Sequence, residues 1–216
     1  INQFGKKNFV GTFAPPWSVV CDTELLHTLP DEEWRCGFSE IVKIGLLQDP
    51  ALLDEVERGA DQIFARKDEP ATSVIARSAR LHLNHITRGG DPFELDEARP
   101  LDFGHWSAHK LEQMTNFHLR HGDAVSVGLA LDVVYADLAG LAEKGLAERV
   151  LSILERLGLP YSDPALQRID QLLEGLQEFR EHLGGKLTIT LVPRVGEPLD
   201  VHEIDDSLIK KAASYL

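Results

Sequence analysis

Histidines gather in one short part of the sequence. Four of the nine histidines lie between Leu101 and Asp123, and some of them follow helical spacing. His105, His109 and Glu112 stand at positions i, i+4 and i+7, so a helix would project all three from one face. Imidazole and carboxylate groups are zinc ligands, and a catalytic zinc needs three of them plus an open position. The spacing is compatible with a metal site, and also with histidines in core or surface roles.

His121 adds another imidazole just before a long apolar run, with Gly122 beside it. A histidine at a helix N-terminus is disfavoured as a cation by the helix dipole, and the neutral ring is the form that binds metal. His118 is instead expected to be exposed to solvent.

A carboxylate ligand could come from an earlier helix. Glu33, Glu40 and Lys43 are separated by seven and three residues, so they share one helical face. A glutamate on this face is a candidate metal ligand. The alternative is an ordinary solvated face with an i,i+3 ion pair, which contributes a few tenths of a kcal/mol.

Common catalytic and nucleotide-binding motifs are absent from the sequence. It contains no HExxH, no GxSxG, no P-loop lysine motif and no GxGxxG, so it has no Rossmann turn to hold a dinucleotide. Arg180 and His182 precede a Gly-Gly pair typical of a helix end, where they could bind a phosphate. Basic clusters of this kind are more often simply solvated.

Composition limits the classes of partner. The formal charge of −13 argues against nucleic acid and anionic membrane surfaces, whose charges would repel the protein. No apolar run approaches the roughly 18 residues of a membrane span. Cys21 and Cys36 cannot form a disulfide framework and are interpreted as reduced thiols. We expect a cytoplasmic protein.

Apolar spacing predicts a mainly α fold of seven or eight helices with one or two short strands. The expected helices cover about 30–48, 50–66, 71–87, 124–141, 142–157 and 164–183, with a terminal helix capped by Asp205 or Asp206. Strands are expected at 17–21 and within 183–196. Residues 1–29 are expected to form a loop and strand segment, and residues 30–216 are expected to form a helical domain that binds metal and substrate.

Four blocks in order carry a family resemblance: "GKKNFVGTFAPPWSVVCD", "LLHTLPDEEWRCGFSEIVKIGLL", "DFGHWSAHKLE" and "RHGDAVSVGLALD". From Asn2 to about Gly196, the chain resembles the dehydroquinate synthase superfamily, the sugar phosphate cyclases. The resemblance implies the multihelical C-terminal domain of that fold. The N-terminal α/β nucleotide-binding domain is expected to be absent from this chain, and the loop-like start at Ile1 suggests a piece of a longer protein.

The resemblance also implies a metal site. Zinc or cobalt would be held by Glu40, His105 and His121, whereas helical spacing alone made His105 and His109 the natural pair. His109 would instead face the substrate and its phosphate, and Lys43 would contact substrate hydroxyls.

NAD is the second implied cofactor. Asn8 would bind substrate where nucleotide and substrate meet. The residues implied at the nucleotide are Lys7, Leu25, Thr28, Leu29 and Glu33. NAD would oxidise a ring hydroxyl of a heptulose 7-phosphate; phosphate would leave, hydride would return, the ring would open and an aldol step would close a carbocycle. The net reaction is that of a carbon–oxygen lyase, and family members are generally homodimers.

Departures from the dehydroquinate synthase pattern bear on the substrate. "ARPLDFGH" puts Arg99 one position closer to the histidine than usual and Asp102 where asparagine is expected. His82 stands where that group has a substrate-binding lysine, and Arg180 or His182 would have to replace another lysine. Loss of cations weakens recognition of a substrate carboxylate, because charge-assisted pairs dominate it.

These departures resemble 2-epi-5-epi-valiolone synthases, although that group has proline where this chain has His109. We therefore expect a cyclitol-forming sugar phosphate cyclase. The alternatives are a 3-dehydroquinate synthase of the shikimate pathway and a non-catalytic, metal-binding helical remnant. Under each of these three interpretations, the 216-residue chain alone is expected to bind metal without turning over substrate.

Overall fold

The computed structural model describes residues 11, 17–88, 100–182 and 185–216. Lys7, Asn8 and Arg99 lie outside the described residues, and so does the side chain of His182. The predictions made for these four side chains therefore have no structural counterpart here.

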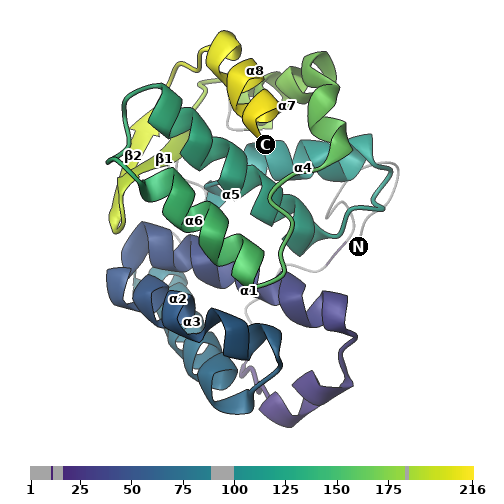
Figure 1. The fold of residues 1–216 in the computed structure, drawn as a ribbon, viewed down its shortest axis with the longest axis vertical. Helices are drawn as coiled ribbons and strands as arrows, with labels where there is room; N and C mark the ends of the chain where they lie inside the picture. Colours follow the sequence, from purple (N-terminus) through teal and green to yellow (C-terminus); the bar gives the residue numbers. More distant parts are fainter. Residues whose placement is uncertain (1–10, 12–16, 89–99, 183–184) are drawn as a thin grey trace.

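The described residues are mainly helical, as predicted (Figure 1). The α-helices are α1 (Asp31–Gln48), α2 (Pro50–Phe64), α3 (Asp68–Arg88), α4 (His105–Met114), α5 (His121–Leu138), α6 (Leu146–Arg156), α7 (Ile169–His182) and α8 (Asp206–Tyr215). Short 3-10 helices are η1 (Thr23–Thr28), η2 (Pro100–Asp102) and η3 (Pro164–Gln167). The strands β1 (Ile189–Arg194) and β2 (Glu197–Val201) form an antiparallel pair.

Several predicted boundaries were wrong. Residues 17–21 form no strand and are exposed, because no other described segment pairs with them. The predicted helix 164–183 is split into η3 and α7, since Arg168 adopts a non-helical backbone between them. Helix α6 begins at Leu146, after Gly145 in the left-handed region at φ 88°. The terminal helix is capped by Asp205, as predicted. The Asp205 side chain accepts a hydrogen bond from the backbone N–H of Ser207.

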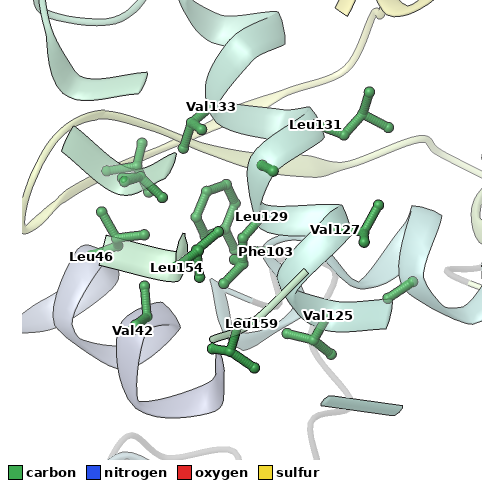
Figure 2. Packing of buried hydrophobic residues seen from close by; sticks show 14 of the residues in the cluster. Val42, Leu46, Phe103, Val125, Val127, Leu129, Leu131, Val133, Leu154 and Leu159 are labelled. Atoms are coloured by element: carbon green, nitrogen blue, oxygen red, sulfur yellow. The ribbon is translucent and has the colours of Figure 1, made fainter. Parts of the chain in front are cut away.

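Helix α5 is the centre of the fold. It is apolar on nearly all sides and packs against α1, α4, α6, α8 and β1. A helix that is hydrophobic all round is stable only when other elements cover it. Figure 2 shows Leu129 of α5 close to Phe103 and Leu154 within this core, and all three are at most 1% exposed.

Helices α1–α3 gather at one end of the molecule, with α4–α8 and the sheet at the other (Figure 1). Helix α1 joins the two groups, because it contacts α2 and α3 as well as α5. Helix α4 is tied to α7 by the buried Lys110, whose ammonium group lies 2.6 Å from Glu178 and 3.3 Å from Glu174. Within the described segments, no helix has the length and apolar character needed to cross a bilayer.

Candidate metal centre

Three side chains from three helices converge on one point. Glu40 lies in the middle of α1, while His105 and His121 are the first residues of α4 and α5. The Glu40 Oε1 atom is 3.3 Å from Nε2 of His105 and 3.4 Å from Nε2 of His121. One ligand atom from each residue lies within 4.8 Å of the other two, which is a spacing that one metal ion could span. The structure thus brings together the three residues that the resemblance implied as metal ligands.

The starts of two helices position the two histidines. Helix α4 begins after Gly104, whose φ of 76° lies in the left-handed region that glycine tolerates. The backbone N–H of Gly104 donates to Asp132 of α5 at 3.0 Å, and Trp106 Nε1 donates to the same carboxyl group at 2.9 Å. Asp132 therefore fixes the first turn of α4, which carries His105.

The ligand atoms are held by partners on their far sides. His105 Nδ1 lies 3.1 Å from the carbonyl oxygen of Phe103. Because a carbonyl oxygen only accepts, Nδ1 carries the proton and Nε2 keeps its lone pair for the cluster. Lys43 Nζ is 2.6 Å from Glu40 Oε2, and His121 Nδ1 is 3.2 Å from Glu112 Oε2.

Glu40 is ionised in this environment. Its burial acts to raise its pKa, but the contacts with His105 and His121 and the charge of Lys43 outweigh that effect. Together they hold the pKa of the carboxyl group well below its ordinary value. An ionised carboxylate beside two imidazoles is a donor set that divalent zinc or cobalt accepts.

His109 lies at the edge of this cluster. Its ring centroid is 5.4 Å from that of His105 and 6.0 Å from that of His121. His109, Glu112 and His121 form a second group whose ligand atoms lie within 4.8 Å of one another. The predicted shared face of His105, His109 and Glu112 is present, and His121 joins Glu40 and His105 in the first group. His118 is exposed, as predicted.

A cavity of about 690 Å³ opens beside the cluster. It runs along α1 and is walled by residues of η1, α3 and η2 as well as the first residue of α4. The site residues predicted from the sequence that line it are Leu29, Glu33, Glu40, Lys43, His82, Asp102 and His105. Lys43 is buried, whereas His82 and Glu33 are exposed, and Glu33 accepts from Arg120 Nε at 2.9 Å.

Three further predicted residues lie elsewhere. Leu25 and Thr28 of η1 are exposed and do not line the cavity, although Leu29 beside them does. Arg180 of α7 lines a separate cavity of about 580 Å³, and its Nε donates to the carbonyl oxygen of Gly185 at 2.6 Å. The described structure therefore does not bring Arg180 to the metal cluster.

Sequence reasoning missed Asp132. Its burial raises the pKa of the carboxyl group to about 7, and the hydrogen bonds from Trp106 and Gly104 offset only part of that effect. The signal was present, because Asp132 is an acidic residue within an otherwise apolar helix, and buried acids need partners. The sequence alone could not show that those partners belong to α4.

Comparison with known proteins identifies the family. The C-terminal family model, described as "3-dehydroquinate synthase C-terminal", matches residues 37–180, and the "3-dehydroquinate synthase N-terminal" model matches residues 1–36. The chain belongs to the 3-dehydroquinate synthase family. The two matches meet within α1, whereas the sequence predicted a division between residues 29 and 30.

Two relatives of this 3-dehydroquinate synthase family chain are named for two different activities. The chain is 33% identical over 210 residues to a 2-epi-valiolone synthase of Actinosynnema mirum, covering 95% of this chain and 54% of the relative. It is 32% identical over 211 residues to a 3-dehydroquinate synthase of Xylella fastidiosa, covering 95% of this chain and 56% of the relative. The chain thus spans about half the length of these relatives.

Solved structures agree on the fold. ValA, a 2-epi-5-epi-valiolone synthase from Streptomyces hygroscopicus subsp. jinggangensis with NAD⁺ and Zn²⁺ bound, matches with a TM-score of 0.91 and 27% identity, over 100% of this chain and 59% of ValA. A 2-deoxy-scyllo-inosose synthase complexed with carbaglucose-6-phosphate, NAD⁺ and Co²⁺ matches with a TM-score of 0.78 over 99% of this chain and 60% of that one. At 20% identity the second match supports the fold alone.

Proposed function

We propose that this protein is an NAD- and metal-dependent sugar phosphate cyclase that converts a heptulose 7-phosphate to a carbocyclic ketone with loss of phosphate. The observation that carries the proposal is the convergence of Glu40, His105 and His121 from three helices beside a cavity. Solved relatives of the same fold contain NAD⁺ with Zn²⁺ or Co²⁺, and one contains a phosphorylated sugar analogue.

The donor set fits a divalent metal. Glu40 offers an ionised oxygen. His105 offers its unprotonated Nε2, because the ring proton is on Nδ1, where it is donated to the carbonyl oxygen of Phe103. When bound, the metal supplies Lewis-acid polarisation of substrate oxygens and NAD accepts and returns a hydride. We assign Glu40, His105 and His121 as the ligands.

Lys43 is the residue best placed to bind substrate hydroxyls near the metal. Lys43 lines the cavity, and the 2.6 Å contact with Glu40 Oε2 fixes the position of its ammonium group. An ammonium group has three donors, so Lys43 can hold Glu40 and still donate to a substrate oxygen. His109, beside His105 and His121, is assigned to the substrate phosphate.

The cavity favours a substrate without a carboxylate, and hence a cyclitol product. Its described wall includes the acids Glu33 and Asp102 besides Glu40, while Lys43 is its one lysine and it holds no arginine. A substrate carboxylate would meet these acids without a bidentate arginine to offset them. Asp102 can instead accept hydrogen bonds from hydroxyls.

A second candidate function is 3-dehydroquinate synthesis. His109 is present here, whereas the valiolone synthase pattern has proline, and the Xylella fastidiosa relative is nearly as similar as the valiolone synthase.

We also propose that the protein works in the cytoplasm as a homodimer. The described cysteines, Cys21 and Cys36, are free thiols, which suits a reducing compartment.

The experiment begins with the metal content of the purified protein and of Glu40→Ala and His105→Ala. One equivalent of zinc or cobalt in the wild type and its loss in both variants is expected. His118→Ala is the matched control, because this exposed histidine lies outside the cluster and its loss should leave the metal in place.

Phosphate release is then measured with NAD and the metal present. Faster release from a heptulose 7-phosphate lacking a carboxylate than from a 3-deoxyheptulosonate 7-phosphate supports the cyclitol-forming activity, and the reverse order supports 3-dehydroquinate synthase. Metal binding by the full-length protein with release from neither substrate would support the non-catalytic remnant. The 216-residue chain by itself is expected to bind metal without turnover.

A further inference from the structure

Of the two metal-binding histidines, His121 is the less constrained by packing. Its side chain is 40% exposed, whereas that of His105 is 10% exposed. Arg120, which precedes it, makes no side-chain cap at the start of α5. An exposed ring at a helix end can rotate, so a hydrogen bond must set the direction of its Nε2 atom.

That hydrogen bond comes from the neighbouring helix. Glu112 Oε2 lies 3.2 Å from Nδ1 of His121, on the side of the ring opposite the Nε2 atom that faces Glu40. The Glu112 side chain is only 8% exposed, although it belongs to the last full turn of α4. A buried carboxyl group has few alternative positions, so it presents a fixed acceptor to the imidazole ring.

We infer that Glu112 is a positioning residue for the metal centre, which orients His121 and holds its proton on Nδ1 so that Nε2 can bind the ion. The inference rests on the proposed function, since it assumes a metal held by Glu40, His105 and His121. Histidine ligands commonly donate their second nitrogen to a carboxylate, which fixes the tautomer and raises the basicity of the bound nitrogen.

The arrangement also explains why Glu112 is not itself a ligand at this site. Nδ1 and Nε2 point away from each other on the imidazole ring, so Glu112 and Glu40 contact opposite sides of His121. The Glu40 side chain is 38% exposed and lines the cavity, where a substrate can reach it. Glu112 is nearly enclosed and is absent from that cavity wall.

The test is zinc affinity, measured by competition with a chromophoric chelator for the wild type, Glu112→Gln and Glu112→Ala. Loss of such a carboxylate typically weakens metal binding by about 10- to 100-fold. We expect the larger loss for Glu112→Ala and a smaller one for Glu112→Gln, whose amide oxygen can still accept from Nδ1. Glu112→Gln also keeps the side-chain volume, so it tests the inference if Glu112→Ala folds poorly.

Lys110→Met is the matched control. Lys110 is a buried charge on the same helix, but its partners lie on α7. This variant is expected to lose stability while keeping the wild-type zinc affinity, which separates damage to α4 from loss of His121 orientation. The cobalt-loaded protein gives a second readout, because its visible absorption bands should shift in both Glu112 variants and not in Lys110→Met.

Each outcome has a separate meaning. Wild-type zinc affinity and cobalt bands in both Glu112 variants would overturn the inference while leaving the metal site intact. A second bound zinc that disappears in Glu112→Ala and in His109→Ala would overturn it as well, since Glu112 would then be a ligand in the second group. Absence of metal from the wild type would remove the proposed function together with this inference.

Discussion

Replacing Gly128 by alanine should separate the two helices that carry the proposed histidine ligands. Gly128 lies in α5 where this helix touches the start of α4. An added Cβ would lie 2.9 Å from Ser107 Oγ and 3.0 Å from the carbonyl carbon of Gly104, with the Gly104 oxygen closer still. Most of the obstruction is backbone, so no side-chain rotation can relieve it.

The cost follows from these distances. Non-bonded carbons are most favourable at about 3.5 Å or more, so α4 and α5 would have to move apart by several tenths of an ångström or more. Overpacking of a well-packed core costs about 1–3 kcal/mol, and a backbone obstruction belongs at the upper end. The better helix propensity of alanine returns up to about 1 kcal/mol. The net loss of stability is therefore about 2 kcal/mol.

Urea unfolding of the metal-free protein measures this loss, and Gly37→Ala is the matched control. Gly37 is an exposed residue of α1 with no atom within 4 Å of an added Cβ, so the control should gain about 0.5–1 kcal/mol. Zinc affinity should also fall in Gly128→Ala, since Gly104 precedes His105. A Gly128→Ala protein that gains stability as the control does would refute the reasoning.

Three further substitutions have expected outcomes. The pKa of Asp132 is raised to about 7 in the fold. Its contribution to stability is therefore complete below about pH 4 and is lost as pH rises toward 7. Across that range the free energy of unfolding in urea should fall by up to ~1.4 kcal/mol per pH unit, and Asp132→Asn should remove this slope. Asp49 caps α2 at Ala51 and Leu52 and pairs with Arg77, so Asp49→Ala should cost about 2 kcal/mol by urea unfolding, without loss of bound zinc. The buried Ser126 hydroxyl has no hydrogen-bond partner in the described chain. Ser126→Ala should therefore raise the free energy of unfolding in urea by about 1 kcal/mol.

Opposite results would contradict the structural basis of each. A pH profile unchanged by Asp132→Asn would mean that the carboxyl group is not buried as described. Neutral behaviour of Asp49→Ala would mean that the cap and the Arg77 pair contribute little. A destabilised Ser126→Ala would reveal a partner for that hydroxyl.

Local patterns in the sequence determined the helical class and the composition of each helix face. The spacing of Glu40 and Lys43 predicted their proximity, which the 2.6 Å contact confirms. The shared face of His105, His109 and Glu112 was predicted equally well. Helical periodicity is a property of neighbouring residues, so it can be read without knowing the fold.

The expectation of a strand at 17–21 failed for the complementary reason. Alternation and apolar character favour a strand, but a strand needs a partner for its backbone groups. The sheet that forms instead joins β1 and β2, which are connected by a tight turn. Pairing is a tertiary fact that the short apolar run could not determine.

Only the packing of α1, α4 and α5 decided which histidine meets Glu40. Spacing alone paired His105 with His109, yet His121 is the residue brought to Glu40, because the start of α5 passes close to α1 at Gly122 and Cys36. The family resemblance anticipated that choice, but the residues by themselves did not. Distances between helices depend on how side chains fill the space between them, and no single helix records them.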